Sequence, residues 1–151
     1  MTADTQLDAA RLCERLPHTG DVCQIESVSH CDEDGIVCLT RAHRRADNPL
    51  RVGDRLGVLA GVEMAGQAMA LHQALRGDDG PPRTGVVTRA GDLRWQVERL
   101  DQLPGPLVIQ VTKEVEAGEL ARYRFSLSHD EQVVVEGRLS VLTTSGEAPT
   151  G

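Results

Sequence analysis

The sequence predicts an α+β domain in which an antiparallel β-sheet wraps around one long buried helix. Three observations lead to this fold class. The segment from Val58 to Leu75 is the longest apolar run of the chain and is rich in the helix formers Ala, Met and Leu. Its apolar residues lie nearly all round the helix, which indicates a buried helix. Strand-like runs joined by short turn sequences precede and follow it, and such runs form antiparallel sheets.

Before this helix, the sequence predicts a short helix and a β-hairpin. The short helix begins at Asp4 or Thr5, either of which can cap it, and runs to about residue 15, before Pro17 stops it. Two strands follow, over residues 22–29 and 36–43, joined by the turn sequence Asp32-Glu33-Asp34-Gly35. Residues 44–57 have no clear periodicity, so we expect an irregular segment there.

After the helix, the sequence predicts a loop over residues 76–83 and then a series of strands. The first strand starts at residue 84 and ends at 88, or continues through a bend to 97. The next three cover residues 107–116, 120–128 and 132–142, with turns at Gly118 and at Asp130-Glu131. One domain, 1–151, therefore accounts for the chain, with its core at about 10–142 and a disordered tail at 145–151.

Composition and charge argue against two classes of protein, those that bind nucleic acid and those that span a membrane. The formal net charge is −7, and the chain has one Trp, one Tyr and one Phe. It therefore lacks the basic surface and the stacking aromatic residues of a nucleic-acid-binding protein. No apolar run reaches the length of about 18 residues that a membrane-spanning helix needs, and the N-terminal residues do not resemble a secretory signal. We expect a cytoplasmic protein with no membrane insertion.

The cysteines at positions 13, 23, 31 and 38 do not have the spacing of metal ligands. No C-x-x-C pair occurs among them, and no closely spaced pair of histidines accompanies them. We expect four reduced thiols that serve as small apolar side chains, and neither a zinc site nor a disulfide.

Three segments then resemble the hotdog-fold 3-hydroxyacyl-[acyl-carrier-protein] dehydratases: LPH at 16–18, AGVEMAGQAMALH at 60–72 and EGRLSVL at 136–142. The likeness covers about residues 10–142 and is greatest for a divergent bacterial branch of aryl-polyene-type dehydratases, in which a segment like HRxxxNPLR precedes the helix. It implies a dimeric hotdog protein that converts a 3-hydroxyacyl thioester on acyl carrier protein to the trans-2-enoyl thioester. It implies no cofactor beyond the phosphopantetheine arm that carries the substrate.

The resemblance places Glu63 at the family's catalytic acidic position, near the start of the buried helix. A buried carboxyl group has a raised pKa and can donate a proton to the departing hydroxide, whereas the helix N-terminus lowers that pKa. The sequence does not decide which effect is larger. The alternative is a solvated glutamate in the first helical turn, which the apolar surroundings disfavour.

Two further parts of the helix are candidates for substrate binding. Free backbone N–H groups at residues 57–61 could stabilise negative charge on the thioester oxygen, and Gly57 and Gly61 would permit close approach. Gln67 lies one turn beyond Glu63 on the same face, at the family's glutamine position. For Gln67, a structural role is the stronger interpretation.

Two histidines are candidates for the catalytic base, and His43 is the first choice. The best-known dehydratases carry this histidine in a Gly-His-Phe-Pro loop before the acid, but the corresponding stretch here, NPLRVGDRLGVLAG, contains none. His43 precedes the irregular segment, where the resembling branch also has a histidine, and His18 belongs to LPH. We expect solvated side chains at His30 and His129, which fall at turns. His72 lies on the opposite side of the helix from Glu63.

Arg44, Arg45 and Arg51 belong to an arginine cluster in an otherwise acidic chain. They form either a docking surface for an acidic acyl carrier protein and its phosphate, or a solvated surface paired with Asp47 and Asp54.

Three functions remain open. The first is the dehydratase, as a homodimer at least. The second is a hotdog acyl thioesterase, since that fold also uses an acidic residue in this helix region. The third is a non-catalytic hotdog subunit that forms a heterodimer with an active dehydratase, because the family's loop histidine is missing here.

Overall fold

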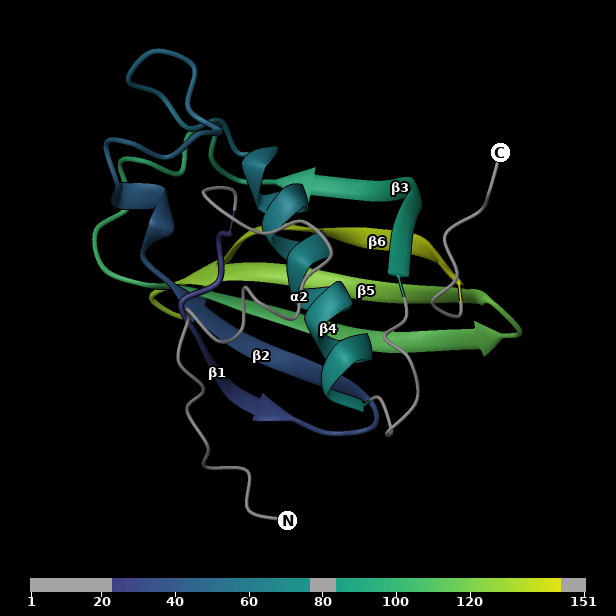
Figure 1. The fold of residues 1–151 in the computed structure, drawn as a ribbon. Helices are drawn as coiled ribbons and strands as arrows, with labels where there is room; N and C mark the ends of the chain where they lie inside the picture. The colour runs from purple at the N-terminus through teal and green to yellow at the C-terminus, as the bar shows by residue number, and fades with distance from the viewer. Residues whose placement is uncertain (1–22, 77–83, 145–151) are drawn as a thin grey trace.

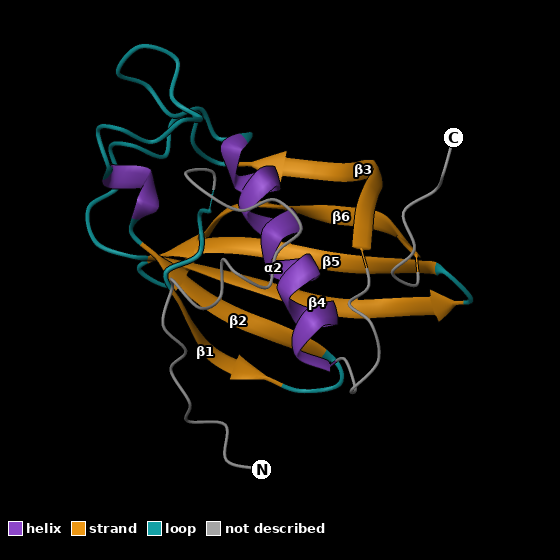
Figure 2. Cartoon of the chain, viewed as in Figure 1, coloured by secondary structure: helices purple, strands orange, loops and turns teal. Residues whose placement is uncertain are grey.

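The computed structural model describes residues 23–76 and 84–144, in which one α-helix lies across one face of a six-stranded antiparallel sheet (Figures 1 and 2). The predicted fold class, a hotdog arrangement of one long helix on an antiparallel sheet, is confirmed. The predicted first helix, His18 and the predicted disordered tail lie outside the described residues.

The helices of the described part are η1, a short 3-10 helix (Ala42–Arg44), and α2 (Ala60–Arg76). The strands are β1 (Ser27–Cys31), β2 (Gly35–Thr40), β3 (Thr84–Trp95), β4 (Leu107–Ala117), β5 (Leu120–His129) and β6 (Gln132–Thr144). The sheet order is β1-β2-β4-β5-β6-β3, and every neighbouring pair is antiparallel. β1 and β3 therefore form the two edges of the sheet (Figure 1).

The first hairpin differs from the prediction at both ends. β1 begins at Ser27 rather than residue 22, because the backbone N–H of Gln24 donates to the side chain of Gln67 instead of to a neighbouring strand. β2 ends at Thr40 rather than residue 43. There the Thr40 hydroxyl accepts the N–H of Ala42, and the chain turns into η1. His43 consequently lies in a helical turn and not at the end of a strand.

The strand after the helix takes the longer of its two predicted forms. β3 runs to Trp95 and has two bulges, one between Val87 and Arg89 and one between Gly91 and Arg94. Bulges bend a strand and increase its twist, and Figure 1 shows β3 sharply bent. The predicted turns at Gly118 and at Asp130-Glu131 are confirmed, with positive φ at all three residues.

The core lies between α2 and the sheet. Along β5 and the first half of β4, buried positions alternate with more exposed ones, as the pleat requires. The helix contributes five apolar side chains that are at most 1% exposed: Met64, Ala65, Ala68, Met69 and Leu71. At Gly61 the helix comes so close to the sheet that a Cβ atom would lie 3.0 Å from the side chains of both Leu127 and Val135. Packing therefore explains this glycine.

Two of the cysteines match the expectation of reduced thiols and one does not. Cys31 and Cys38 form no disulfide bond, and burial raises the pKa of Cys38 to about 12, so that this thiol packs as an uncharged apolar group. Cys23 is disulfide-bonded, so the expectation of four reduced thiols is wrong at this residue. Within residues 23–76 and 84–144, no group of three or more His, Cys, Asp or Glu residues could hold a metal ion. No helix in this part is long and apolar enough to span a membrane.

Candidate functional site

Glu63 lies in the first turn of α2 on the side of the helix that faces away from the sheet. It is exposed, and no other described residue forms a hydrogen bond or an ion pair with it. Leu59 on the same side is 58% exposed, and Gly66 and Ala70 continue the row with partial exposure. Over residues 60–75 only Glu63 is exposed, so the prediction of a buried helix holds except along this one side, which is partly open. This open side presents a single carboxylate among apolar residues.

Three of the backbone N–H groups at residues 57–61, where the sequence predicts free donors, already have an acceptor: those of Val58, Ala60 and Gly61. The N–H groups of Ala60, Gly61 and Val62 donate to the carbonyl oxygens of the residues three positions earlier, at distances of 2.9 to 3.0 Å. The helix thus begins as a tight 3-10 turn, which uses these donors internally. Gly57 is exposed, with no atom within 4 Å of where a Cβ would stand, while Gly61 is buried against the sheet.

Gln67 faces the chain before β1 and not the open side of α2. It is 8% exposed, and its Oε1 accepts the backbone N–H of Gln24 at 2.6 Å. This contact fixes the segment that leads into β1 against the helix. The hydrogen bond to Gln24 therefore supports a structural role for Gln67.

His43 is completely buried, and its ring is held by the loop that precedes β4. Its Nε2 lies 2.9 Å from the carbonyl oxygen of Leu103, so Nε2 carries the proton and Nδ1 keeps its lone pair. Within residues 23–76 and 84–144, no group forms a hydrogen bond with Nδ1. Burial lowers the pKa of His43, although the bond to Leu103 opposes this effect. The ring thus has the electronic state of a general base, but it has no access to solvent.

The other described histidines have structural surroundings. His72 is buried and bonds the Tyr123 hydroxyl through Nδ1 at 2.8 Å and the Asp32 carbonyl through Nε2 at 2.7 Å. His30 is exposed and pairs with Asp32, as expected for a turn. His129 is less exposed than expected, because its Nε2 lies 2.6 Å from the carbonyl oxygen of Pro104.

No hydrogen bond or ion pair joins Glu63 to His43. Glu63 projects from the open side of α2, and the ring of His43 is enclosed beside Leu103. His18, the second candidate base, lies outside the described residues. The described part of one chain therefore presents an acidic group without an adjacent base.

The three predicted docking arginines all have partners within the chain. Arg44 donates to the backbone carbonyl of Asp101 at 2.7 Å, and Arg45 forms two bonds to the carboxylate of Asp47 at 3.1 and 3.2 Å. Arg51 donates to the carbonyl oxygens of Asp54 and His43, and its buried Nε is unpartnered. Arg44 and Arg45 nevertheless remain exposed.

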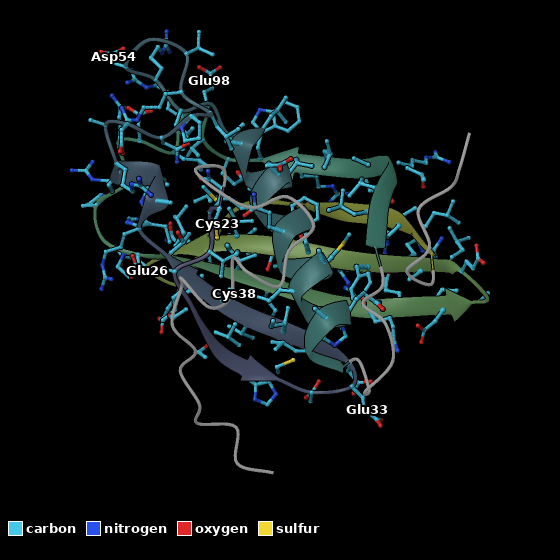
Figure 3. All side chains as sticks on the ribbon, in the orientation of Figure 1. Cys23, Glu26, Glu33, Cys38, Asp54 and Glu98 are labelled. Atoms are coloured by element: carbon cyan, nitrogen blue, oxygen red, sulfur yellow. The ribbon has the colours of Figure 1, made fainter. Side chains whose placement is uncertain are left out.

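The loop that carries these arginines ends in a tight turn before α2. The backbone groups of Val52 and Arg55 bond each other across Gly53 and Asp54, and Val52 is 82% exposed. Figure 3 shows Asp54 and Glu98 at the same end of the molecule. The backbone N–H of Val58 donates to the carbonyl of Glu98, which joins this loop to the segment after β3.

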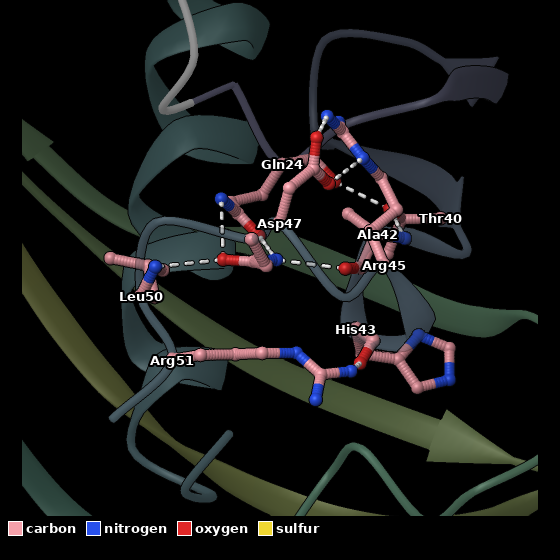
Figure 4. Close-up of polar contacts among 9 residues, drawn as sticks. Gln24, Thr40, Ala42, His43, Arg45, Asp47, Leu50 and Arg51 are labelled. Atoms are coloured by element: carbon pink, nitrogen blue, oxygen red, sulfur yellow. Dashed lines mark hydrogen bonds and ion pairs between the residues drawn. The ribbon is translucent and has the colours of Figure 1, made fainter. Parts of the chain in front are cut away.

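Sequence reasoning missed a buried cluster of amide side chains between β1, the arginine loop and α2 (Figure 4). Gln24 is 1% exposed and Asn48 is 4% exposed. Asn48 belongs to the NPLR segment of the resemblance, and that was the only signal available for it. Nothing in the sequence marks Gln24, because its neighbours suggest an ordinary strand.

Nearly the whole chain is similar to known proteins. A family model described as "ApeP-like: ApeP dehydratase" matches residues 10–149. No curated protein sequence matches the chain at a significant level. Among solved structures, the dehydratase heterocomplex ApeI:P from Xenorhabdus doucetiae is similar with a TM-score of 0.75 and 20% identity, over 88% of this chain and 90% of that chain.

Two thioesterases are also similar to this chain. One from Haemophilus influenzae has a TM-score of 0.67 and 16% identity, over 100% of both chains. A mutant thioesterase from Pseudomonas aeruginosa has a TM-score of 0.65 and 15% identity, over 95% of this chain and 99% of that chain. At such identities, these structures show a shared fold and no more.

Proposed function

Because the chain belongs to the ApeP-like dehydratase family, we propose that it takes part in the dehydration of 3-hydroxyacyl thioesters carried by an acyl carrier protein. The observation that carries this proposal is Glu63, an exposed carboxyl group on the open side of α2 that forms no hydrogen bond or ion pair with another described residue. In the reaction, a base removes the proton on the carbon next to the thioester carbonyl. An acid protonates the hydroxyl group on carbon 3, which leaves as water. A trans double bond then forms between carbon 2, which lost the proton, and carbon 3. We assign Glu63 the role of this acid.

His43 remains our first candidate for the base, and His18 the second. The lone pair on the His43 Nδ1 and the hydrogen bond that orients the ring favour this role. Its complete burial means that the loop around Leu103 has to move before His43 can reach a substrate.

The enclosure of His43 also bears on which subunit this chain pairs with. β3 is an edge strand with β6 on one side and no described strand on the other, and its Val87 and Trp95 are 45% and 50% exposed. Such an edge can pair with a strand of another subunit. A second copy of this chain would add another buried His43. If His43 stays enclosed, an accessible base has to come from a different subunit. We therefore propose a heterodimer with another hotdog subunit, as the ApeI:P heterocomplex would suggest.

We propose that the exposed cations Arg44 and Arg45 bind the acidic carrier protein. Arg51 holds their loop in place by donating to the carbonyl oxygens of Asp54 and His43. The internal bonds of Arg44 and Arg45 fix the guanidinium groups in place and leave further N–H donors for a phosphate.

A second candidate function is a non-catalytic subunit that stabilises or orients an active hotdog partner. The burial of His43 favours it, since the isolated chain then has no accessible base among the described residues. The thioesterase remains a third reading, for which the structural neighbours provide the fold only.

The test is turnover of a 3-hydroxyacyl-acyl-carrier-protein thioester, with enoyl product and free thiol measured in the same reaction. The chain is assayed alone and with any hotdog subunit that co-purifies, as wild type and as Glu63→Gln, His43→Ala and His18→Ala. Glu33→Gln serves as the control, because Glu33 is an exposed carboxylate in the β1–β2 turn. Enoyl formation that is lost in Glu63→Gln and kept in Glu33→Gln supports the dehydratase. Free thiol without enoyl product favours the thioesterase, and activity that survives Glu63→Gln in the two-subunit complex favours the non-catalytic role.

A further inference from the structure

A buried chain of hydrogen bonds joins the helix that carries Glu63 to the turn that carries His43, and Gln24 stands at its centre. Its backbone N–H donates to Oε1 of Gln67 at 2.6 Å, one helical turn beyond Glu63. Its backbone carbonyl accepts the Thr40 hydroxyl at 2.5 Å. Its side-chain Oε1 accepts Nδ2 of Asn48 at 2.8 Å (Figure 4). Gln24 thus connects three separate segments of the chain.

Two of these contacts converge on Ala42, the residue directly before His43. The N–H of Ala42 donates to the Thr40 hydroxyl at 2.9 Å, and its carbonyl accepts Nδ2 of Asn48 at 2.8 Å. Thr40 and Asn48 are each bonded to Gln24. The backbone of Ala42 is therefore held on both sides by residues that Gln24 holds in turn.

The same amide group also fixes the far end of the loop. Oδ1 of Asn48 accepts the backbone N–H of Leu50 at 2.8 Å, and Arg51 closes the loop by donating to the carbonyl oxygen of His43 at 3.3 Å. Buried amide groups lower stability unless their hydrogen bonds are satisfied, and a satisfied network fixes one geometry where an apolar contact would tolerate several. The network therefore specifies the position of the His43 turn.

We infer that Gln24 and Asn48 are positioning residues for His43, which they hold in its place relative to the Glu63 helix. This inference rests on the proposed function, in which His43 is the candidate base. The amide pair does not contact the His43 ring itself, which is held by Leu103. The pair acts through the backbone of Ala42, so its loss would move the η1 turn and admit water to the ring.

The readout is the titration of the His43 ring, followed by NMR in the whole chain. The charged and titratable groups around the ring are Arg44, Arg51 on the same loop, and His129 beside Asp130 at the end of β5. None of these is changed in the variants. We expect wild-type His43 to titrate below the ordinary value of about 6.5, because it is buried.

Two variants remove the network at different points. Asn48→Ala deletes the amide group, and Thr40→Val deletes only a hydroxyl while it conserves volume. In both variants, we expect the pKa of His43 to rise toward about 6.5 as water reaches the ring. Asp47→Asn is the matched control, since Asp47 is the exposed neighbour of Asn48 and its side chain bonds Arg45 outside the network, and there we expect the wild-type titration. Folded variants that keep the wild-type titration would overturn the inference. Unfolding of both variants would also overturn it, because the network would then serve stability alone.

Kinetics separate this inference from the proposed function. In the enoyl assay, we expect Asn48→Ala and Thr40→Val to lower kcat at least tenfold with little change in KM, since substrate-binding groups stay in place. If His43→Ala leaves the activity intact, His43 is not the base and that part of the proposed function fails. The NMR titration would still decide whether Gln24 and Asn48 position the His43 turn.

Discussion

Arg99 donates two hydrogen bonds to the carboxylate of Asp101, from Nε to Oδ1 at 3.1 Å and from its terminal nitrogen to Oδ2 at 2.6 Å. Asp101 is 9% exposed, and its Oδ1 also accepts the backbone N–H of Leu56 at 2.9 Å. Arg44 donates to the backbone carbonyl of the same residue. The loop before β4 is thereby tied to the segment that enters α2, so Asp101 supports the start of the helix that carries Glu63.

Because the carboxylate of Asp101 is hydrogen-bonded in the folded chain, we expect the protein to lose stability in acid. The hydrogen bonds from Arg99 lower the pKa of Asp101 well below its unfolded value of about 3.9. A carboxyl group with a depressed folded-state pKa contributes its full stability above the unfolded pKa and loses it as the pH falls toward the folded pKa. At pH 7 we expect Asp101→Asn to lower the free energy of unfolding by about 1–3 kcal/mol, because two buried donors lose a charged acceptor.

Urea unfolding between pH 7 and pH 3 measures this effect. The difference between wild type and Asp101→Asn should stay constant down to about pH 4 and shrink below that, where the unfolded wild-type chain takes up a proton that the folded chain still excludes. A constant difference over this range would show that the charge of Asp101 contributes nothing to stability.

Gly61 and Gly66 lie in the same helix and should respond oppositely to alanine. A Cβ at Gly61 would stand 3.0 Å from the side chains of Leu127 and Val135, whereas a Cβ at Gly66 would meet only Val87, at 3.6 Å. Alanine favours a helix by about 1 kcal/mol over glycine, and an overpacked core costs about 1–3 kcal/mol. We expect Gly66→Ala to stabilise the chain by up to about 1 kcal/mol and Gly61→Ala to destabilise it. Chemical denaturation of both variants tests this, and stabilisation by Gly61→Ala would contradict the close packing of α2 on the sheet.

The elements of the fold could be predicted because each depends on a local pattern. The apolar run from Val58 to Leu75 predicts α2 to within two residues of each end, and the turn residues Gly118 and Asp130 separate β4, β5 and β6 where expected. The end of β2 could not be predicted in this way. Thr40 ends the strand because its hydroxyl bonds Ala42 and Gln24, and the second of these contacts bridges residues distant in the sequence.

The candidate site was less predictable, because exposure depends on how the elements pack. Glu63 has apolar neighbours in the sequence, which suggested burial, but it faces away from the sheet. His43 looked accessible at a strand end, but the loop around Leu103, sixty residues later, covers it. The roles of both residues stay proposals. Gln24 gave no signal at all, since its importance arises from contacts with Gln67, Thr40 and Asn48.

His43 predicts a second, milder dependence of stability on pH. Burial lowers its pKa in the folded chain, so the unfolded chain binds a proton more readily between the folded-state pKa and about 6.5. Stability should therefore fall as the pH decreases through this window, by at most about 1.4 kcal/mol per pH unit. We expect the urea midpoint of wild type to drop between pH 7.5 and pH 5.5, and that of His43→Gln to change less. An equal drop in both proteins would assign the effect to other groups.

The outer face of the sheet carries a pair of arginines that needs a shared carboxylate. Arg124 on β5 lies directly opposite Arg138 on β6, and like charges in such positions repel. Glu114 on β4 lies 3.4 Å from the Arg124 guanidinium and 2.9 Å from that of Arg138. The side chain of Glu114 is 18% exposed, so solvent screens it less than its partners. Glu114 also lies 3.7 Å from the Arg122 guanidinium, and Arg138 pairs with Asp92 as well, at 2.8 Å. Glu114 is the carboxylate that Arg124 and Arg138 share.

We expect Glu114→Gln to lower the free energy of unfolding by about 1 kcal/mol, with a smaller loss at high salt, which screens the repulsion between Arg124 and Arg138. Adding Arg124→Thr to Glu114→Gln should recover part of the loss, because the uncompensated pair is then gone and threonine suits a strand. Glu116→Gln is a suitable control, since Glu116 is an exposed carboxylate on the same strand that pairs with Lys113. Denaturation of these variants at low and high salt decides the matter: a loss in Glu114→Gln that is independent of salt and unaffected by Arg124→Thr would mean that Glu114 acts by packing and not by its charge.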